Sequence, residues 1–141
     1  MRKVLEEQEP KKRSRTARSR QFERAHVDLP ISYSIVEEDL IRKGNAQIVD
    51  LSAGGARMCG AADFTQGSQI TLRFTLPSGQ RELYVRGRIV MSFFDGPGQQ
   101  YSHGVAFTHI SRSDQEAIVR HVDDVLLSNV RFLKPSQQGL K

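Results

Sequence analysis

Apolar and polar residues alternate from residue 26 to residue 35, and this period of two is typical of a half-buried β-strand. The apolar positions are Val27, Leu29, Ile31, Tyr33 and Ile35. The segment EEDLIRKGN is expected to return the chain. Five further strand-like segments follow, separated by turn signals: 45–51, 56–60, 68–76, 83–93 and 101–107. Six short strands joined by turns predict an all-β barrel or sandwich.

One helix is expected near the C-terminus, in SRSDQEAIVRHVDDVLLSN. Ser113 and Glu116 have the spacing of a capping box. The apolar stripe at helical period is Ile118, Val119, Val122, Val125 and Leu126. This helix is expected to lie across an open end of the barrel or over one sheet. The predicted domain is 18–128, between a disordered basic tail (1–17) and a flexible tail (129–141).

The net charge of +5 is confined to the N-terminal segment. Residues 1–24 hold nine Lys or Arg and four Glu, whereas residues 25–141 hold twelve basic and twelve acidic side chains. A nucleic-acid-binding domain more often spreads basic residues over a folded face. No exposed aromatic row typical of a stacking platform for bases is evident either. No binding to DNA or RNA is therefore expected, although a barrel that binds them through its basic tail is one alternative.

Nothing in the sequence indicates an enzyme or a metal site. The four histidines lack metal-ligand spacing, and no phosphate loop or nucleophile elbow is present. The single cysteine, Cys59, is expected to be a small core residue. It cannot form an internal disulfide, and no transmembrane or secretory segment is evident, so a cytoplasmic location is expected.

The stretch VDLSAGG ends the second predicted strand. Asp50 and Ser52 project from the same side of an extended chain because side chains alternate. Gly54 and Gly55 are expected to permit positive φ and the close approach of another group. A structural turn suits the same residues, because Asp and Ser bond their own backbone in turns.

Arg20 and Arg24 stand four apart where the basic tail meets the first strand, as RQFER. With DLSAGG following between the second and third strands, the sequence resembles the PilZ domain family over roughly residues 18–127. The two family signatures, R-x-x-x-R and D/N-x-S-x-x-G, are both complete. This resemblance implies a six-stranded antiparallel β-barrel that binds the bacterial second messenger cyclic di-GMP and acts in signal transduction without catalysis.

The resemblance implies a ligand site formed by Arg20, Arg24, Asp50, Ser52 and Gly55. Arginine meets phosphate in a bidentate fork, or guanine O6 and N7. The carboxylate accepts from the guanine N1–H and N2–H₂ donors. The serine binds a phosphate oxygen or fixes the turn, and the glycine leaves room for the base.

Two departures from the family pattern concern further site residues. Many relatives carry an arginine directly before R-x-x-x-R, where this chain has Ser19, and Arg18 is a partial substitute. The number of ligands per site, one or two, therefore stays open. Many relatives also place an aromatic near the end of the fifth strand, where Met91 or Phe93 is the candidate.

The sequence thus predicts a barrel that binds cyclic di-GMP, needs no other cofactor, and relays the signal to an effector protein by a conformational change. The alternative is a PilZ-like adaptor that binds a partner protein without nucleotide. The sequence identifies neither the effector and its pathway nor the oligomeric state.

Overall fold

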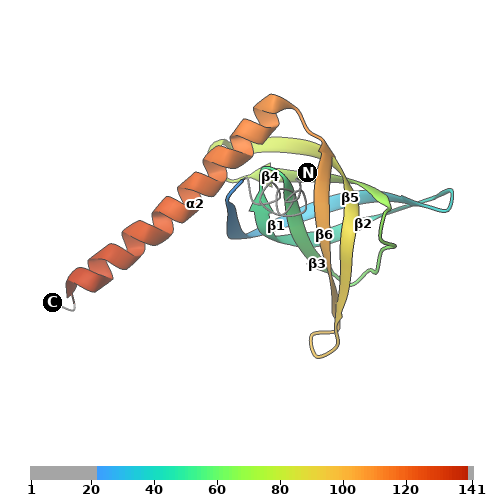
Figure 1. Ribbon diagram of the computed structural model, residues 1–141, viewed down its shortest axis with the longest axis horizontal. Helices are drawn as coiled ribbons and strands as arrows, with labels where there is room; N and C mark the ends of the chain where they lie inside the picture. Colours follow the sequence, from blue (N-terminus) through green and yellow to red (C-terminus); the bar gives the residue numbers. More distant parts are fainter. Residues whose placement is uncertain (1–21, 140–141) are drawn as a thin grey trace, which may run out of the picture.

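The computed structural model describes residues 22–139, with side chains as far as residue 129. Six antiparallel strands close into a barrel in the order β1–β2–β3–β6–β5–β4 (Figure 1). The strands are β1 Arg24–Glu37, β2 Leu40–Ser52, β3 Gly55–Gly60, β4 Gln69–Leu76, β5 Arg81–Asp95 and β6 Gln100–His109. A 3₁₀ turn, η2 (Ser78–Gln80), joins β4 to β5, and helix α2 (Arg112–Gly139) follows β6. The predicted six-stranded barrel with a C-terminal helix is confirmed.

The barrel interior is filled by the apolar positions of the alternating strands, as expected for a small barrel. Leu83, Val85 and Ile89 of β5 are fully buried, and Tyr84, Arg86 and Arg88 between them are exposed. The other fully buried aliphatic side chains include Ile35, Ile48, Leu51, Ile70 and Leu72. The period-two pattern therefore determines both which residues are strands and which face of each strand forms the core.

The connection between β1 and β2 is much shorter than the sequence suggested. Only Glu38 and Asp39 form the turn, and both have positive φ (49° and 68°), as a type I′ hairpin turn requires. The segment EEDLIRKGN is thus mostly strand, and its hairpin extends beyond the barrel (Figure 1). Leu40 and Ile41 are 69% and 64% exposed. Because the hairpin buries neither face there, no alternation marks these residues as strand.

Helix α2 is capped by a serine that differs from the expected one. The Asp114 N–H donates to Ser111 Oγ at 3.0 Å, immediately before the first helical residue, Arg112. The capping box expected at Ser113 and Glu116 is therefore wrong by two residues. The spacing S-x-x-acidic occurs twice in SRSDQE, and the earlier serine, at the true boundary, makes the bond.

The first turns of α2 close one end of the barrel. Ile118 and Val122 are buried there. Arg81, at the start of β5, donates to Asp114 Oδ1 at 2.7 Å and to Ser113 Oγ at 2.7 Å. The helix therefore lies over the barrel end, as one of the two expected placements required.

The remainder of α2 runs away from the barrel (Figure 1). The helix continues to Gly139, so the segment expected to be a flexible tail from residue 129 is helical as far as that residue. The expectation rested on Pro135, which lacks an N–H and usually ends a helix nearby. Residues 127–134 contain no glycine and several good helix formers, which favour continuation.

The opposite end of the barrel is closed by Phe64, from the loop between β3 and β4. Its ring lies 4.9 Å from that of Tyr33 and 4.8 Å from that of His103. The Phe64 N–H donates to His103 Nε2 at 3.2 Å. Burial lowers the pKa of His103, which favours the neutral imidazole that can accept this bond. His103 therefore has a structural role at this end of the barrel.

Candidate functional site

A cavity of about 530 Å³ lies on the outer face of the barrel, near the end that α2 covers. Six of the nine predicted site residues line it: Arg24, Asp50, Ser52, Gly54, Gly55 and Met91. They come from the start of β1, the β2–β3 hairpin and β5. The other three, Arg18, Ser19 and Arg20, lie outside the described residues. A cavity of this size is within the range of small-molecule sites.

One cross-strand row spans five strands, and four of its five residues line the floor of the cavity, whereas His26 lies beside it. Strand register pairs His26 with Asp50, Asp50 with Arg57, Arg57 with Gly104, and Gly104 with Met91. Directly opposite residues in antiparallel strands have neighbouring Cβ atoms. The row therefore places an imidazole, a carboxylate, a guanidinium, a glycine and a thioether side by side.

Asp50 is the most buried charged group of this row, with a side chain only 12% exposed. Arg57 donates through Nε at 2.9 Å to Asp50 Oδ2, and its Nη2 lies 2.8 Å from the same oxygen. His26 Nδ1 lies 2.6 Å from Oδ1. His26 and Arg57 were not among the predicted site residues, because only strand register brings them beside Asp50.

Ser52 holds the β2–β3 turn through its hydroxyl. Its Oγ accepts from the Gly54 N–H at 3.2 Å and lies 3.3 Å from the Gly55 carbonyl oxygen, to which it donates. The Phe107 N–H on β6 donates to the Gly54 carbonyl at 2.9 Å. The serine thus makes the contacts of a structural turn, one of the two roles that the sequence left open.

Neither glycine of this turn has positive φ, and Gly55 instead permits close packing of two strands. Among the described glycines only Gly67 and Gly79 have positive φ, so the positive φ expected at Gly54 and Gly55 is wrong, whereas the expected close approach is found at Gly55. A Cβ at Gly55 would lie closer than 3.0 Å to the Val105 carbonyl oxygen on β6. A side chain at position 55 would therefore force β3 away from β6.

Gly55→Ala is expected to destabilise the protein by about 1–3 kcal/mol, because overpacking against backbone cannot relax by a rotamer change. The measurement is the free energy of unfolding in urea. Gly54→Ala is the matched control, because a Cβ there meets the Phe22 ring at 3.4 Å, an ordinary contact. Equal stability of the two variants would show that the approach to Val105 does not constrain the turn.

Arg24 lies at the mouth of the cavity, opposite Ser52 in the β1–β2 register. The arginine is exposed to solvent. Among residues 22–129, whose side chains are described, none forms an ion pair with Arg24. Its guanidinium is therefore available to an anion at the cavity mouth.

The β5 side of the cavity is apolar. Met91 and Val90 line it, and both are about half exposed. Phe93 is 62% exposed and is absent from the cavity lining. Of the two candidates for the aromatic position of the family, the structure therefore brings Met91, not Phe93, to the cavity.

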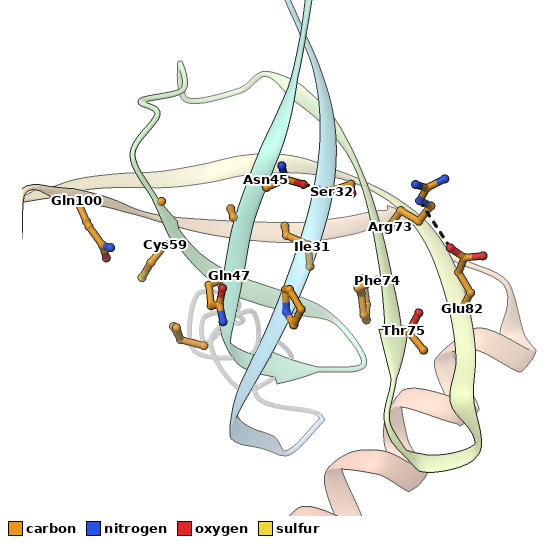
Figure 2. Close-up of a pocket in the computed structure, with 14 residues that line it drawn as sticks. Ile31, Ser32, Asn45, Gln47, Cys59, Arg73, Phe74, Thr75, Glu82 and Gln100 are labelled. Atoms are coloured by element: carbon orange, nitrogen blue, oxygen red, sulfur yellow. Dashed lines mark hydrogen bonds and ion pairs between the residues drawn. The ribbon is translucent and has the colours of Figure 1, made fainter.

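A larger cavity, of about 750 Å³, lies on another face and contains none of the predicted site residues. Figure 2 shows its labelled lining, mostly neutral polar side chains such as Ser32, Asn45 and Gln47, with Arg73 drawn paired to Glu82. Arg73 Nε lies 3.6 Å from Glu82 Oε2. Arg73 already has a carboxylate partner. This cavity is therefore less suited to bind an anion than the cavity at Asp50.

Cys59 departs from its expected core position. It is half-buried, with Sγ 3.8 Å from Ser102 Oγ. On β3, Ala56 and Met58 point inward, so residues 57 and 59 point outward.

Within the described part of the chain, no three His, Cys, Asp or Glu side chains gather as metal ligands would. Over the same residues, no helix is both long and apolar enough to cross a bilayer.

The sequence model of the PilZ domain matches residues 18–124. This match covers most of the chain, and the protein belongs to the PilZ domain family. None of the curated proteins compared with the chain matches it.

Solved structures show the same fold. The Bacillus subtilis inhibitor of motility MotI/DgrA has a TM-score of 0.66 at 21% identity, over 77% of this chain and 52% of that one. The PilZ domain of YcgR from Escherichia coli, solved with c-di-GMP, has a TM-score of 0.58 at 11% identity, over 82% and 97%.

A tetrameric PilZ domain from Xanthomonas campestris, described as self-assembled via a helical bundle, has a TM-score of 0.60 at 12% identity, over 86% of this chain and 99% of that one. This chain spans about half the length of MotI/DgrA. At these identities the likeness shows the fold alone.

Proposed function

We propose that this protein binds cyclic di-GMP in the cavity at Asp50 and relays its presence to an effector protein. The observation that carries the proposal is the convergence of Arg24, Asp50, Ser52 and Gly55 on one cavity. These residues come from two motifs that lie far apart in the sequence. The PilZ domain of YcgR, which has this fold, was solved with that ligand.

The chemistry of the cavity suits a ligand that combines phosphates with guanines. Arg24 at the mouth offers a charge-assisted fork to a phosphate or to guanine O6 and N7. Asp50 on the floor is an acceptor for the guanine N1–H and N2–H₂ groups. Met91 and Val90 give the base an apolar wall, and Arg20 and Arg18 precede Arg24 as further cations for the phosphates.

The positions of the two arginines suggest how ligand binding is signalled to the effector. Arg20 and Arg24 precede or begin β1, whereas Asp50, Ser52 and Gly55 belong to the β2–β3 hairpin. A ligand held by both groups fixes the N-terminal segment against the barrel, and the effector reads that change. The alternative is an adaptor that binds a partner protein without nucleotide through the same surface.

Calorimetric titration of the full chain with cyclic di-GMP tests the proposal directly. Saturable binding is expected, and the molar ratio at saturation reports whether Ser19, in place of the further family arginine, permits one ligand or two. Asp50→Ala is the control for the site and is expected to bind more weakly. Absence of binding by the unsubstituted protein would favour the nucleotide-free adaptor.

A further inference from the structure

The Asp50 carboxylate is largely occupied before any ligand arrives. Arg57 makes two contacts to Oδ2, at 2.9 and 2.8 Å, and His26 Nδ1 lies 2.6 Å from Oδ1. An ionised carboxylate has about four lone-pair positions in all. Three are taken, so only one remains, on Oδ1. A guanine edge brings two donors, N1–H and N2–H, and one existing partner must therefore leave.

The two partners of Asp50 are held to very different degrees. Arg57 contacts Oδ2 through two nitrogen atoms, and the β2–β3 register places it directly opposite Asp50. His26 makes a single contact, and its side chain is 90% exposed. The β1–β2 register is also irregular between His26 and Leu29. The histidine is therefore the partner that can be displaced with little loss of packing.

We propose that guanine displaces His26 from Asp50 Oδ1 while Arg57 stays on Oδ2 as a positioning residue. This inference rests on the proposed function and adds an internal competitor to it. Once His26 leaves, both lone-pair positions of Oδ1 are free for N1–H and N2–H. Because His26 stands two residues after Arg24 on β1, its release also alters the strand that carries the arginine.

The test of the competitor is calorimetric titration of His26→Ala with cyclic di-GMP. One exposed hydrogen bond is removed from the ligand-free state, so binding is expected to tighten about two- to ten-fold. His109→Ala is the matched control, because that histidine is exposed on β6 and contacts Thr108 Oγ1 rather than Asp50. In an Asp50→Ala background the His26 substitution is expected to change nothing.

The test of the positioning role uses Arg57→Met, which keeps the apolar stem and removes both donors. The ratio of the affinity for cyclic di-GMP to that for cyclic di-AMP is expected to fall at least about ten-fold. Without Arg57 the Asp50 carboxylate is no longer held in the orientation that distinguishes guanine from adenine. Arg57→Lys is expected to restore part of the ratio. If Arg57→Met only loosened the structure, it would weaken the binding of both ligands equally. That result would overturn the positioning role.

Titration of the His26→Ala variant and of the unsubstituted protein separates an error in the His26 displacement from an error in the proposed function. If the unsubstituted protein binds cyclic di-GMP but His26→Ala binds equally or more weakly, the displacement is wrong and the function stands. A gain that persists without Asp50 would also overturn the displacement, because His26 would then act elsewhere. If the unsubstituted protein does not bind, the function and the inference fail together.

Discussion

Arg24→Ala is expected to weaken cyclic di-GMP binding about 30- to 150-fold. The substitution removes a charge-assisted bidentate contact of about 2–3 kcal/mol at the cavity mouth. The fold should persist, because the residue is exposed and, among the described side chains, no ion partner is lost. Arg20→Ala is expected to act in the same direction from its place in the motif. Calorimetry gives the affinities, and urea unfolding checks the stability.

Arg120→Ala is the matched control for Arg24→Ala. Arg120 is exposed on α2 and lies outside the cavity lining, so the same charge is lost without a contact to the ligand. The control is expected to bind as the unsubstituted protein does. Near-native binding by both Arg24→Ala and Arg20→Ala would remove the arginine motif from the ligand site.

The barrel was predictable because its strands bury one face each. Along β5, Leu83, Val85 and Ile89 alternate with exposed residues, and that pattern can be read without coordinates. The outer half of the β1–β2 hairpin was not predictable in this way. Leu40 and Ile41 are exposed there, so burial leaves no period in the sequence. Pattern reasoning therefore finds strands only as far as the core extends.

The candidate site was predictable to the extent that it lies in local motifs. Asp50, Ser52 and Gly55 belong to one hairpin, so their proximity follows from the chain itself. The partners of Asp50 were missed for the opposite reason. His26 and Arg57 reach it only across strand pairs, and their register depends on bulges beside His26 and Asp50. A one-residue change in register would turn either side chain to the other face.

The role of the glycines shows a further limit of sequence reasoning. A glycine pair in a turn suggests positive φ, yet Gly54 and Gly55 have none. Gly55 is needed because a Cβ at this position would come too close to the Val105 carbonyl oxygen of β6. β3 and β6 are far apart in the sequence, so the motif indicated a glycine without revealing the neighbour that requires it.

Selectivity for guanine is expected to be the largest effect, with cyclic di-AMP bound at least about 30-fold more weakly than cyclic di-GMP. Adenine presents an amino donor where guanine has the O6 acceptor, and it lacks the N1–H and N2–H₂ donors. An arginine at that edge and the Asp50 carboxylate would each be left unpaired, at about 1–3 kcal/mol apiece. The measurement is a competition titration with the two cyclic dinucleotides.

The same titration separates a guanine pocket from a basic tail that collects phosphates. Residues 1–18 carry seven Lys and Arg side chains. If all seven neutralised duplex phosphates, the affinity for DNA would fall with salt at a log–log slope of about −6. A ligand with two phosphates held through Asp50 should show a shallow slope instead. Competition by a short DNA duplex as effective as by cyclic di-GMP at physiological salt, or equal binding of the two cyclic dinucleotides, would make the tail the functional element.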